Sequence, residues 1–561
     1  MSFYNACLTG LIALLIVGCT QSPNPITDQE SNLPNINRPD AMAKDNSAVH
    51  VTSAPMPAPA PSPAPISADR SASYYYAQRP VPPAFYEYEN RENYEHLDNN
   101  PVKLVANDPV STFSIDVDTG SYSNVRRILN EGRMPPQGAV RIEEMINYFN
   151  YQYPQPKGRQ PFSIVTEMAP SPWNNDTQLL HVGIQGVEFS AKERPDANLV
   201  FLVDVSGSMN QPNKLGLLKS SLKLLVKNMR DEDRIAIAVY AGAAGTVLES
   251  TPGKDRRKII SALDKLHAGG STNGAAGIKL AYQIASENYI AGGINRIMLA
   301  TDGDFNVGTT NFEQLIEMVE RERKNGVSLT TLGFGAGNYN DHLSEQLADA
   351  GNGNHAYIDN LREANKVLVE QMGATLQTIA KDVKIQLEFN PAHVSQYRLI
   401  GYENRMLKRE DFNNDKIDAG EIGAGHTVTA LYEIVLADSD GGWVEPLKYQ
   451  QNKPAEDANL SGELAELRIR YKQPEGNNSE LILQPLDRKA IIADLEDSSE
   501  NFRFAAAVAG FGQVLRGADM LNDFNYEHVL ELARAARSDD QHGYRGEFVS
   551  LVSLASSIDQ N

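Results

Sequence analysis

Short apolar runs alternate with amphipathic segments from about residue 197 to 380, and this alternation is the strongest constraint on the fold. The apolar runs predict buried strands near 198–204, 234–240, 245–250, 295–301, 328–334 and 354–358. The segments between them, and the segment 361–379 after the last strand, have the length and period of helices. Strands joined by crossover helices pair in parallel. The pattern therefore predicts an α/β fold, with a doubly wound, mostly parallel, Rossmann-like sheet covered by helices on both faces.

The predicted strand at 245–250 is an exception to parallel pairing. Only four residues, 241–244, separate it from the strand at 234–240. So short a connection has no room for a crossover helix, and the two strands must form an antiparallel pair. We therefore expect one antiparallel strand at an edge of the sheet.

Oxygen-bearing side chains follow three of these elements. They belong to Asp204, Ser206, Ser208, Thr272 and Asp302. The first three form an Asp-x-Ser-x-Ser triplet after strand 198–204, the threonine lies in the Gly-rich loop 267–274, and the last aspartate follows strand 295–301. Open α/β sheets bind ligands at the carboxyl ends of their parallel strands. Carboxylates and hydroxyls there suit a hard divalent cation, although single Asp or Ser residues in such loops also serve as helix caps.

This arrangement resembles the von Willebrand factor type A (VWA) domain and its metal-ion-dependent adhesion site, and it matches all five positions of that site in order. The resemblance implies that both serines contact the metal directly and that Asp204 and Asp302 act largely through water. Thr272 would bind directly or through water, depending on state. The expected metal is Mg²⁺ or Mn²⁺. An Asp or Glu of a protein partner would fill its open position.

Segments of a different period flank this α/β domain, which we place at 197–380. The N-terminal flanking domain, 101–196, has strand patterns near 112–117, 162–168 and 178–189. The C-terminal flanking domain, 381–561, begins with period-two alternation and ends in helical segments. Because an inserted domain needs its entry and exit close together, we expect strands of both flanks to share one β-sandwich.

The chain from about residue 93 onward also resembles bacterial VWA-domain lipoproteins that carry an extra domain on each side. The phrases at 113–122, 401–405 and 418–426 are similar to the flanking regions of those proteins. This resemblance implies an envelope protein with the α/β domain in its middle.

The N-terminus predicts a lipid anchor. Residues 1–18 read as a lipoprotein signal peptide, although the first seven residues contain no Lys or Arg, and Ile16-Val-Gly-Cys19 resembles a lipobox. The resemblance implies cleavage before Cys19, acylation of its thiol and attachment to a lipid bilayer. Thr20 and Gln21, rather than Asp, follow the cysteine, and similarity to enterobacterial lipoproteins then implies the outer rather than the inner membrane. Residues 19–100 form a Pro-rich tether that cannot build a core, so the globular part would lie in the periplasm or at the cell surface.

The composition and the absence of two catalytic motifs restrict the classes of function that this chain can have. The formal net charge of -21 argues against a nucleic-acid partner. The sequence contains neither H-E-x-x-H nor G-x-S-x-G, and we expect no enzyme activity. The leading hypothesis is a lipid-anchored module that binds a protein partner through its metal. The alternatives are a metal-dependent envelope hydrolase and a structural scaffold whose metal site is vestigial.

Two weaker motifs leave alternatives open. Asp116 and Asp118 echo the main triplet and indicate either a capped strand-to-helix turn or a second cation site. The segment 411–418 begins like a calcium loop, but Lys416 stands at the glycine position and Ile422 at the glutamate position. A solvated acidic loop is the simpler interpretation of that segment.

Overall fold

The computed structural model describes residues 92–190, 192–303, 311–439, 441–445 and 462–560, which all belong to one compact unit. The signal peptide, Cys19 and nearly all of the tether lie outside the described residues. Within the described ranges, no helix combines the length and the apolar character needed to cross a membrane.

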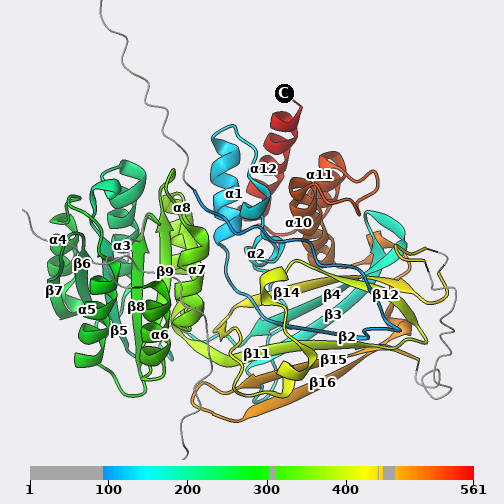
Figure 1. The fold of residues 1–561 in the computed structure, drawn as a ribbon, viewed down its shortest axis with the longest axis horizontal. Coiled ribbons are helices and arrows are strands. Elements are labelled where there is room, and N and C mark those ends of the chain that lie inside the picture. Colours follow the sequence, from blue (N-terminus) through cyan, green and yellow to red (C-terminus); the bar gives the residue numbers. More distant parts are fainter. Residues whose placement is uncertain (1–91, 191, 304–310, 440, 446–461, 561) are drawn as a thin grey trace, which may run out of the picture. The chain divides into compact units, whose positions relative to one another are not determined.

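The central α/β domain contains a six-stranded sheet (Figure 1). Its order is β10 (His355–Ile358), β9 (Ser328–Phe334), β8 (Ile294–Thr301), β5 (Ala197–Asp204), β6 (Arg234–Tyr240) and β7 (Ala244–Pro252). Neighbouring strands pair in parallel except β6 and β7, which are antiparallel. The predicted sheet and its antiparallel edge strand are both confirmed.

Helices cover both faces of this sheet, and the central strand β5 explains why. Leu199, Phe201 and Val203 pack into one core with α3 (Leu217–Asn228) and α4 (Arg256–Asp264). The alternate residues, Val200 and Leu202, pack into a second core on the opposite face. That second core involves α5 (Gly274–Glu287), α6 (Phe312–Arg323) and α7 (Asp341–Ala350). A strand buried on both faces is apolar throughout, which is the continuous run seen in the sequence.

The expected single helix over 361–379 is wrong. The structure has α8 (Leu361–Asn365), a π-helical turn (Lys366–Glu370) and the short α9 (Met372–Leu376). Strand β11 then begins at Thr378 and pairs with β13 (Ile422–Gly423). Pairing with a segment some forty residues away ends the helix, and no local pattern in 361–379 signals it.

The predicted β-sandwich is confirmed, and its strands come from both sides of the α/β domain in the chain. One sheet has the order β1 (Lys103–Leu104), β12 (Val394–Ile400), β14 (Thr427–Leu436), β4 (Asn174–Gly186) and β3 (Phe162–Ser171). The other contains β13, β11 (Thr378–Phe389), β15 (Glu463–Lys472) and β16 (Ser479–Asp487), with β2 (Val110–Ser114) paired to β11. Their inner faces share one core, in which the rings of Phe389 and Tyr397 stack with centroids 4.4 Å apart. The α/β domain is thus inserted into a sandwich.

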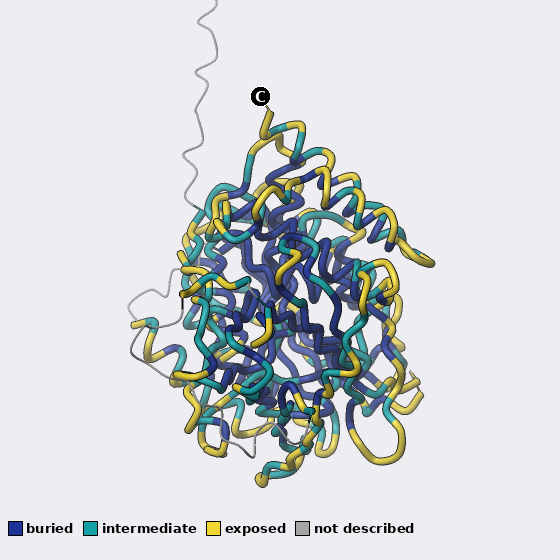
Figure 2. The backbone as a smooth tube through the Cα atoms, turned by 90° about the vertical axis from the view of Figure 1, so that its right-hand side faces the viewer, coloured by how far each residue is buried: buried dark blue, intermediate teal, exposed yellow. Residues whose placement is uncertain are grey.

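Helices from both flanks form a further core. They are α1 (Gly120–Asn130), α2 (Ile142–Asn147), α10 (Glu500–Arg516), α11 (Tyr526–Ala535) and α12 (Tyr544–Asp559). The ring of Phe149, just after α2, lies edge-to-face on Phe504 of α10, with centroids 4.9 Å apart. Buried residues run through the interior of the described unit, and exposed residues lie mainly in loops and at helix surfaces (Figure 2). The expected C-terminal helical region is confirmed.

Candidate metal centre

The Asp-x-Ser-x-Ser triplet forms a tight turn at the end of β5. Asp204 is the last residue of the strand, and its carboxylate Oδ1 accepts a hydrogen bond from the Ser206 backbone N–H at 2.8 Å. The hydroxyl oxygens of Ser206 and Ser208 lie 2.9 Å apart. Asp204 is completely buried, whereas Ser208 is partly exposed. The turn therefore brings a carboxylate and two hydroxyls together at the carboxyl edge of the sheet.

Backbone hydrogen bonds fasten the Gly-rich loop to this turn. The Gly207 N–H donates to the Gly270 carbonyl at 3.0 Å, and the Gly269 N–H donates to the Val205 carbonyl at 2.7 Å. Thr272 lies two residues further along the same loop, half-buried, just before α5. The structure thus places the threonine on a loop that lies directly against the triplet.

The third segment reaches the same edge through strand pairing. Val203 of β5 pairs with Ala300 of β8, so the ends of the two strands lie side by side. The Thr301 hydroxyl donates to Asp204 Oδ2 at 3.5 Å, and Asp302 follows as a completely buried residue. The two predicted aspartates therefore belong to adjacent strand ends.

Burial gives the Asp204 carboxylate an unfavourable environment for negative charge. The pKa of Asp204 is raised to about 6, chiefly by burial and further by the neighbouring charge of Asp302, while hydrogen bonds from Ser206 oppose the shift. A divalent cation would relieve this repulsion. The donor set, two carboxylates with nearby hydroxyls, fits a hard cation such as Mg²⁺ or Mn²⁺.

Sequence reasoning missed a buried lysine in this region. Lys214 lies in the π-helical turn Pro212–Gly216, and its ammonium donates to Asp302 Oδ2 at 2.9 Å. Its side chain is only 3% exposed. A lysine near the start of an amphipathic helix is ordinarily solvent-exposed, so its own position carries no signal of this contact.

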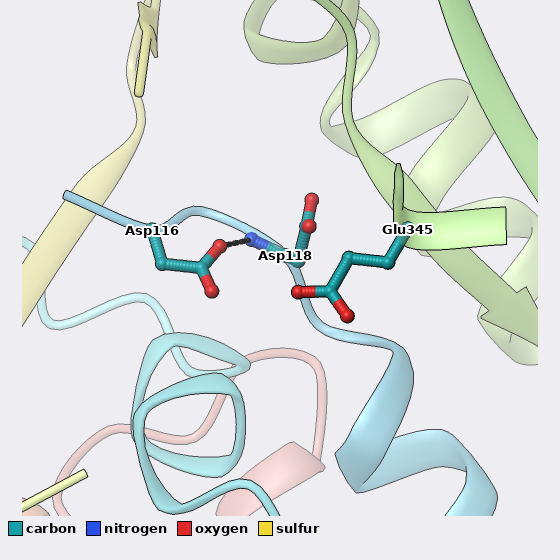
Figure 3. Close-up of side chains that lie close together, drawn as sticks. All are labelled: Asp116, Asp118 and Glu345. Atoms are coloured by element: carbon teal, nitrogen blue, oxygen red, sulfur yellow. Dashed lines mark hydrogen bonds between the residues drawn. The ribbon is translucent and has the colours of Figure 1, made fainter. Parts of the chain in front are cut away.

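The second acidic motif lies elsewhere, between the sandwich and the α/β domain. Asp116 and Asp118 precede α1, Glu345 comes from α7, and the three carboxylates are buried within 4.8 Å of one another (Figure 3). The Arg405 guanidinium contacts all three, at 3.1, 3.4 and 3.0 Å in that order. Asp116 also accepts a hydrogen bond from the Asp118 N–H, which forms the expected turn, but no side chain caps α1. An arginine thus already pairs with every carboxylate of this buried triad.

The calcium-like segment at 411–418 is likewise held by cationic side chains. The Lys384 ammonium donates to the carbonyl oxygens of Asp411 and Asn414, at 3.2 and 2.6 Å. Asp418 forms an ion pair with Arg323 of α6 at 2.6 Å. These contacts, with most of residues 413–418 exposed, favour the interpretation of a solvated acidic loop.

Three known protein families match parts of the chain. Residues 198–371 match the von Willebrand factor type A domain, and residues 88–181 match a family described as von Willebrand factor. Residues 374–558 match the family described as the C-terminal region of the uncharacterized protein YfbK. The match to the von Willebrand factor family ends before the inserted α/β domain, and the match to the YfbK C-terminal family begins near the end of that domain.

Individual relatives range from near to distant. The uncharacterized protein YfbK of Escherichia coli is 47% identical over 473 residues, which cover 83% of this chain and 81% of that protein. The human inter-alpha-trypsin inhibitor heavy chain H3 is 22% identical over 52% of this chain and 37% of its own. A solved von Willebrand factor type A protein from Catenulispora acidiphila covers 70% of this chain and 91% of that one, at 16% identity and a TM-score of 0.39.

Proposed function

The chain belongs to the YfbK family of bacterial VWA-domain proteins, and on this premise we propose that it is a lipid-anchored envelope protein that binds a protein partner through a divalent metal. A VWA domain implies a function in protein interaction or adhesion.

The observation that carries the metal site is the convergence at the carboxyl edge of the sheet. The triplet of Asp204, Ser206 and Ser208 meets the Gly-rich loop through two backbone hydrogen bonds, and Asp302 lies at the adjacent strand end. The two serine hydroxyls would hold the metal directly, and the aspartates and Thr272 would complete the site. The metal would supply positive charge at an edge where buried carboxylates repel each other.

The partner's acidic residue follows from the composition of the proposed ligand set. Hydroxyls are neutral ligands, so a divalent ion held largely by them keeps part of its charge. A carboxylate from another protein is the complementary ligand, because it forms a charge-assisted contact and completes the coordination. We therefore expect a partner that presents an Asp or Glu.

The first experiment measures Mg²⁺ and Mn²⁺ binding by titration calorimetry on the full chain in detergent. Wild type should bind one ion, and Ser208→Ala should weaken binding by at least about tenfold through loss of a direct ligand. Ser220→Ala is the matched control, because Ser220 lies on α3 and its hydroxyl only donates to the Gly216 carbonyl. Wild type that takes up neither ion would contradict the proposal.

A second experiment concerns the partner. Envelope extract is passed over the immobilised full chain, with Mg²⁺ or with EDTA, and with Asp302→Ala as the comparison. We expect that a partner protein is captured only when both the metal and Asp302 are present. Excess acetate should reduce the amount captured. A partner retained equally in EDTA would support the scaffold alternative, and turnover of a substrate would support the hydrolase.

The anchor is tested separately. Cells that express the full chain should incorporate labelled palmitate into it, and Cys19→Ser should abolish this and release the protein from the membrane fraction. Sucrose-gradient separation of the inner and outer membranes then tests the expected outer-membrane location. Retention of the serine variant in the membrane would contradict acylation as the means of attachment.

A further inference from the structure

Lys214 is built into the proposed metal site rather than placed at its rim. Its ammonium donates to Asp302 Oδ2 at 2.9 Å and to Asn338 Oδ1 at 2.7 Å. Asn338 follows β9, so the lysine joins the ends of two adjacent strands, β8 and β9, from a third segment. A buried ammonium with two oxygen partners has a fixed position, unlike a lysine on the surface.

The backbone makes room for the stem of this lysine. Gly335 has φ +82, and a Cβ at that position would overlap with the Lys214 side-chain carbons. A side chain larger than hydrogen would therefore push the lysine away from Asp302. The loop after β9 thus provides both a partner for the ammonium and a channel for the methylene groups.

The lysine changes the charge of the site. Asp204 and Asp302 supply two negative charges, and Lys214, paired with one of them, supplies one positive charge. With the lysine, a bound divalent ion leaves a net positive charge, whereas without it the ion would be neutralised by the two aspartates. In a site shielded from water, a difference of one unit charge is worth far more than at the surface.

We propose that Lys214 determines the specificity of the metal site: it weakens metal binding and keeps the bound metal cationic, so that it captures an acidic partner residue. This inference rests on the proposed function and deepens it. A purely structural lysine predicts the opposite sign, since its loss would loosen Asp302 and weaken metal binding. The direction of the change in Mg²⁺ affinity therefore distinguishes the two roles.

The test is calorimetric titration of Mg²⁺ alone into the full chain in detergent. Lys214→Met and Lys214→Gln should each bind Mg²⁺ at least about tenfold more tightly than wild type, because one opposing charge is removed. The glutamine keeps a donor for Asp302, so it carries the test if the methionine variant fails to fold. Lys223→Met is the matched control, since Lys223 lies on α3 and pairs with Asp264 at the surface.

The second readout is the affinity of the Mg²⁺-loaded protein for an acidic probe, N-acetyl-glutamate amide, followed by ligand NMR. The variants should bind this probe at least about tenfold more weakly than wild type, although they bind the metal more tightly. Opposite changes in the two affinities are the signature of a charge effect, since loss of structure would weaken both.

Each outcome bears on the inference. Unchanged or weaker Mg²⁺ binding in a folded glutamine variant overturns it. If wild type binds no Mg²⁺ but the variants do, the inference stands and the proposed function of the natural protein fails. If neither binds, both are overturned.

Discussion

At the residue scale, Gly303 fixes the backbone immediately after Asp302. It has φ +87, and a Cβ there would overlap with the backbone nitrogen of Asn340. Gly303→Ala should therefore destabilise the protein by at least about 1–3 kcal/mol, the usual cost of such a strained conformation, with the overlap added. The change is measured as the shift in the urea midpoint.

The control for that variant is Gly132→Ala. Gly132 has φ +75, but no atom lies within 4 Å of the position of its Cβ. It should lose only the conformational part, about 1–3 kcal/mol, without the added cost of the overlap. Because Gly303 also positions Asp302, its alanine variant should weaken Mg²⁺ binding, whereas the control should not. Equal losses of stability in the two variants would show that the backbone at Asn340 moves away from the added Cβ without a cost in free energy.

The residues of the proposed metal site also show what can and cannot be predicted from a single sequence. Asp204 and Asp302 could be placed together because both follow apolar runs, and the ends of parallel strands share an edge. Their role as metal ligands is our proposal. Lys214 could not be found in this way, because its contact depends on where the loop after β9 passes. Gly335 and Asn338 lie more than 120 residues away in the chain.

At the element scale, strand β4 contains a buried histidine that should make stability depend on pH. The pKa of His181 is lowered to about 4 by burial, and its Nε2 lies 2.8 Å from the Tyr153 hydroxyl. Between pH 6.5 and 4 the unfolded chain binds a proton that the folded one does not. Stability is therefore lost as pH falls through this range, by about 3 kcal/mol for a shift of this size.

The measurement is urea unfolding of wild type and His181→Gln at pH 7 and at pH 4.5. Wild type should lose about 2–3 kcal/mol more than the variant between the two pH values. Any damage that the glutamine causes to the fold is present at both pH values and cancels in the difference. Parallel losses in the two proteins would mean that His181 is protonated without cost.

Helices and strands could be predicted where their sequence pattern is local. The prediction failed where an element depends on pairing with a distant strand. The strands of the α/β sheet were recognised because burial on both faces makes them apolar throughout. The helix expected at 361–379 failed because its last residues join β11, whose partners β13, β15 and β2 all lie far away in the chain. Helical and strand periods overlap in so short an apolar segment, and only the tertiary partner decides between them.

At the scale of the whole molecule, the inserted VWA domain and the sandwich are joined by buried charge. The insertion itself could be inferred from the sequence, since strand patterns precede and follow the α/β alternation. The charged joint between the two domains could not be inferred, because its residues come from three distant segments: Asp116 and Asp118, then Glu345, then Arg405. No residue among them has a local reason to be buried.

Arg405 gives the last prediction. Besides the triad it contacts Asp349, at 2.5 Å, so one guanidinium holds two carboxylates before α1 and two on α7. Burial raises the pKa of Asp118 well above its usual range, and Arg405 opposes that rise. Arg405→Met would leave the carboxylates buried without this cation and should cost about 3–5 kcal/mol.

The expected readout is calorimetric. Wild type should unfold in a single transition, and Arg405→Met in two, because the VWA domain has its own cores and can melt separately once the joint is lost. Arg488→Met is the matched control, since Arg488 pairs only with the exposed Asp438 in the contacts described and should cost less than about 1 kcal/mol. If both variants unfold in one transition with similar losses, the buried charge does not couple the two domains, and apolar contacts between them must do so instead.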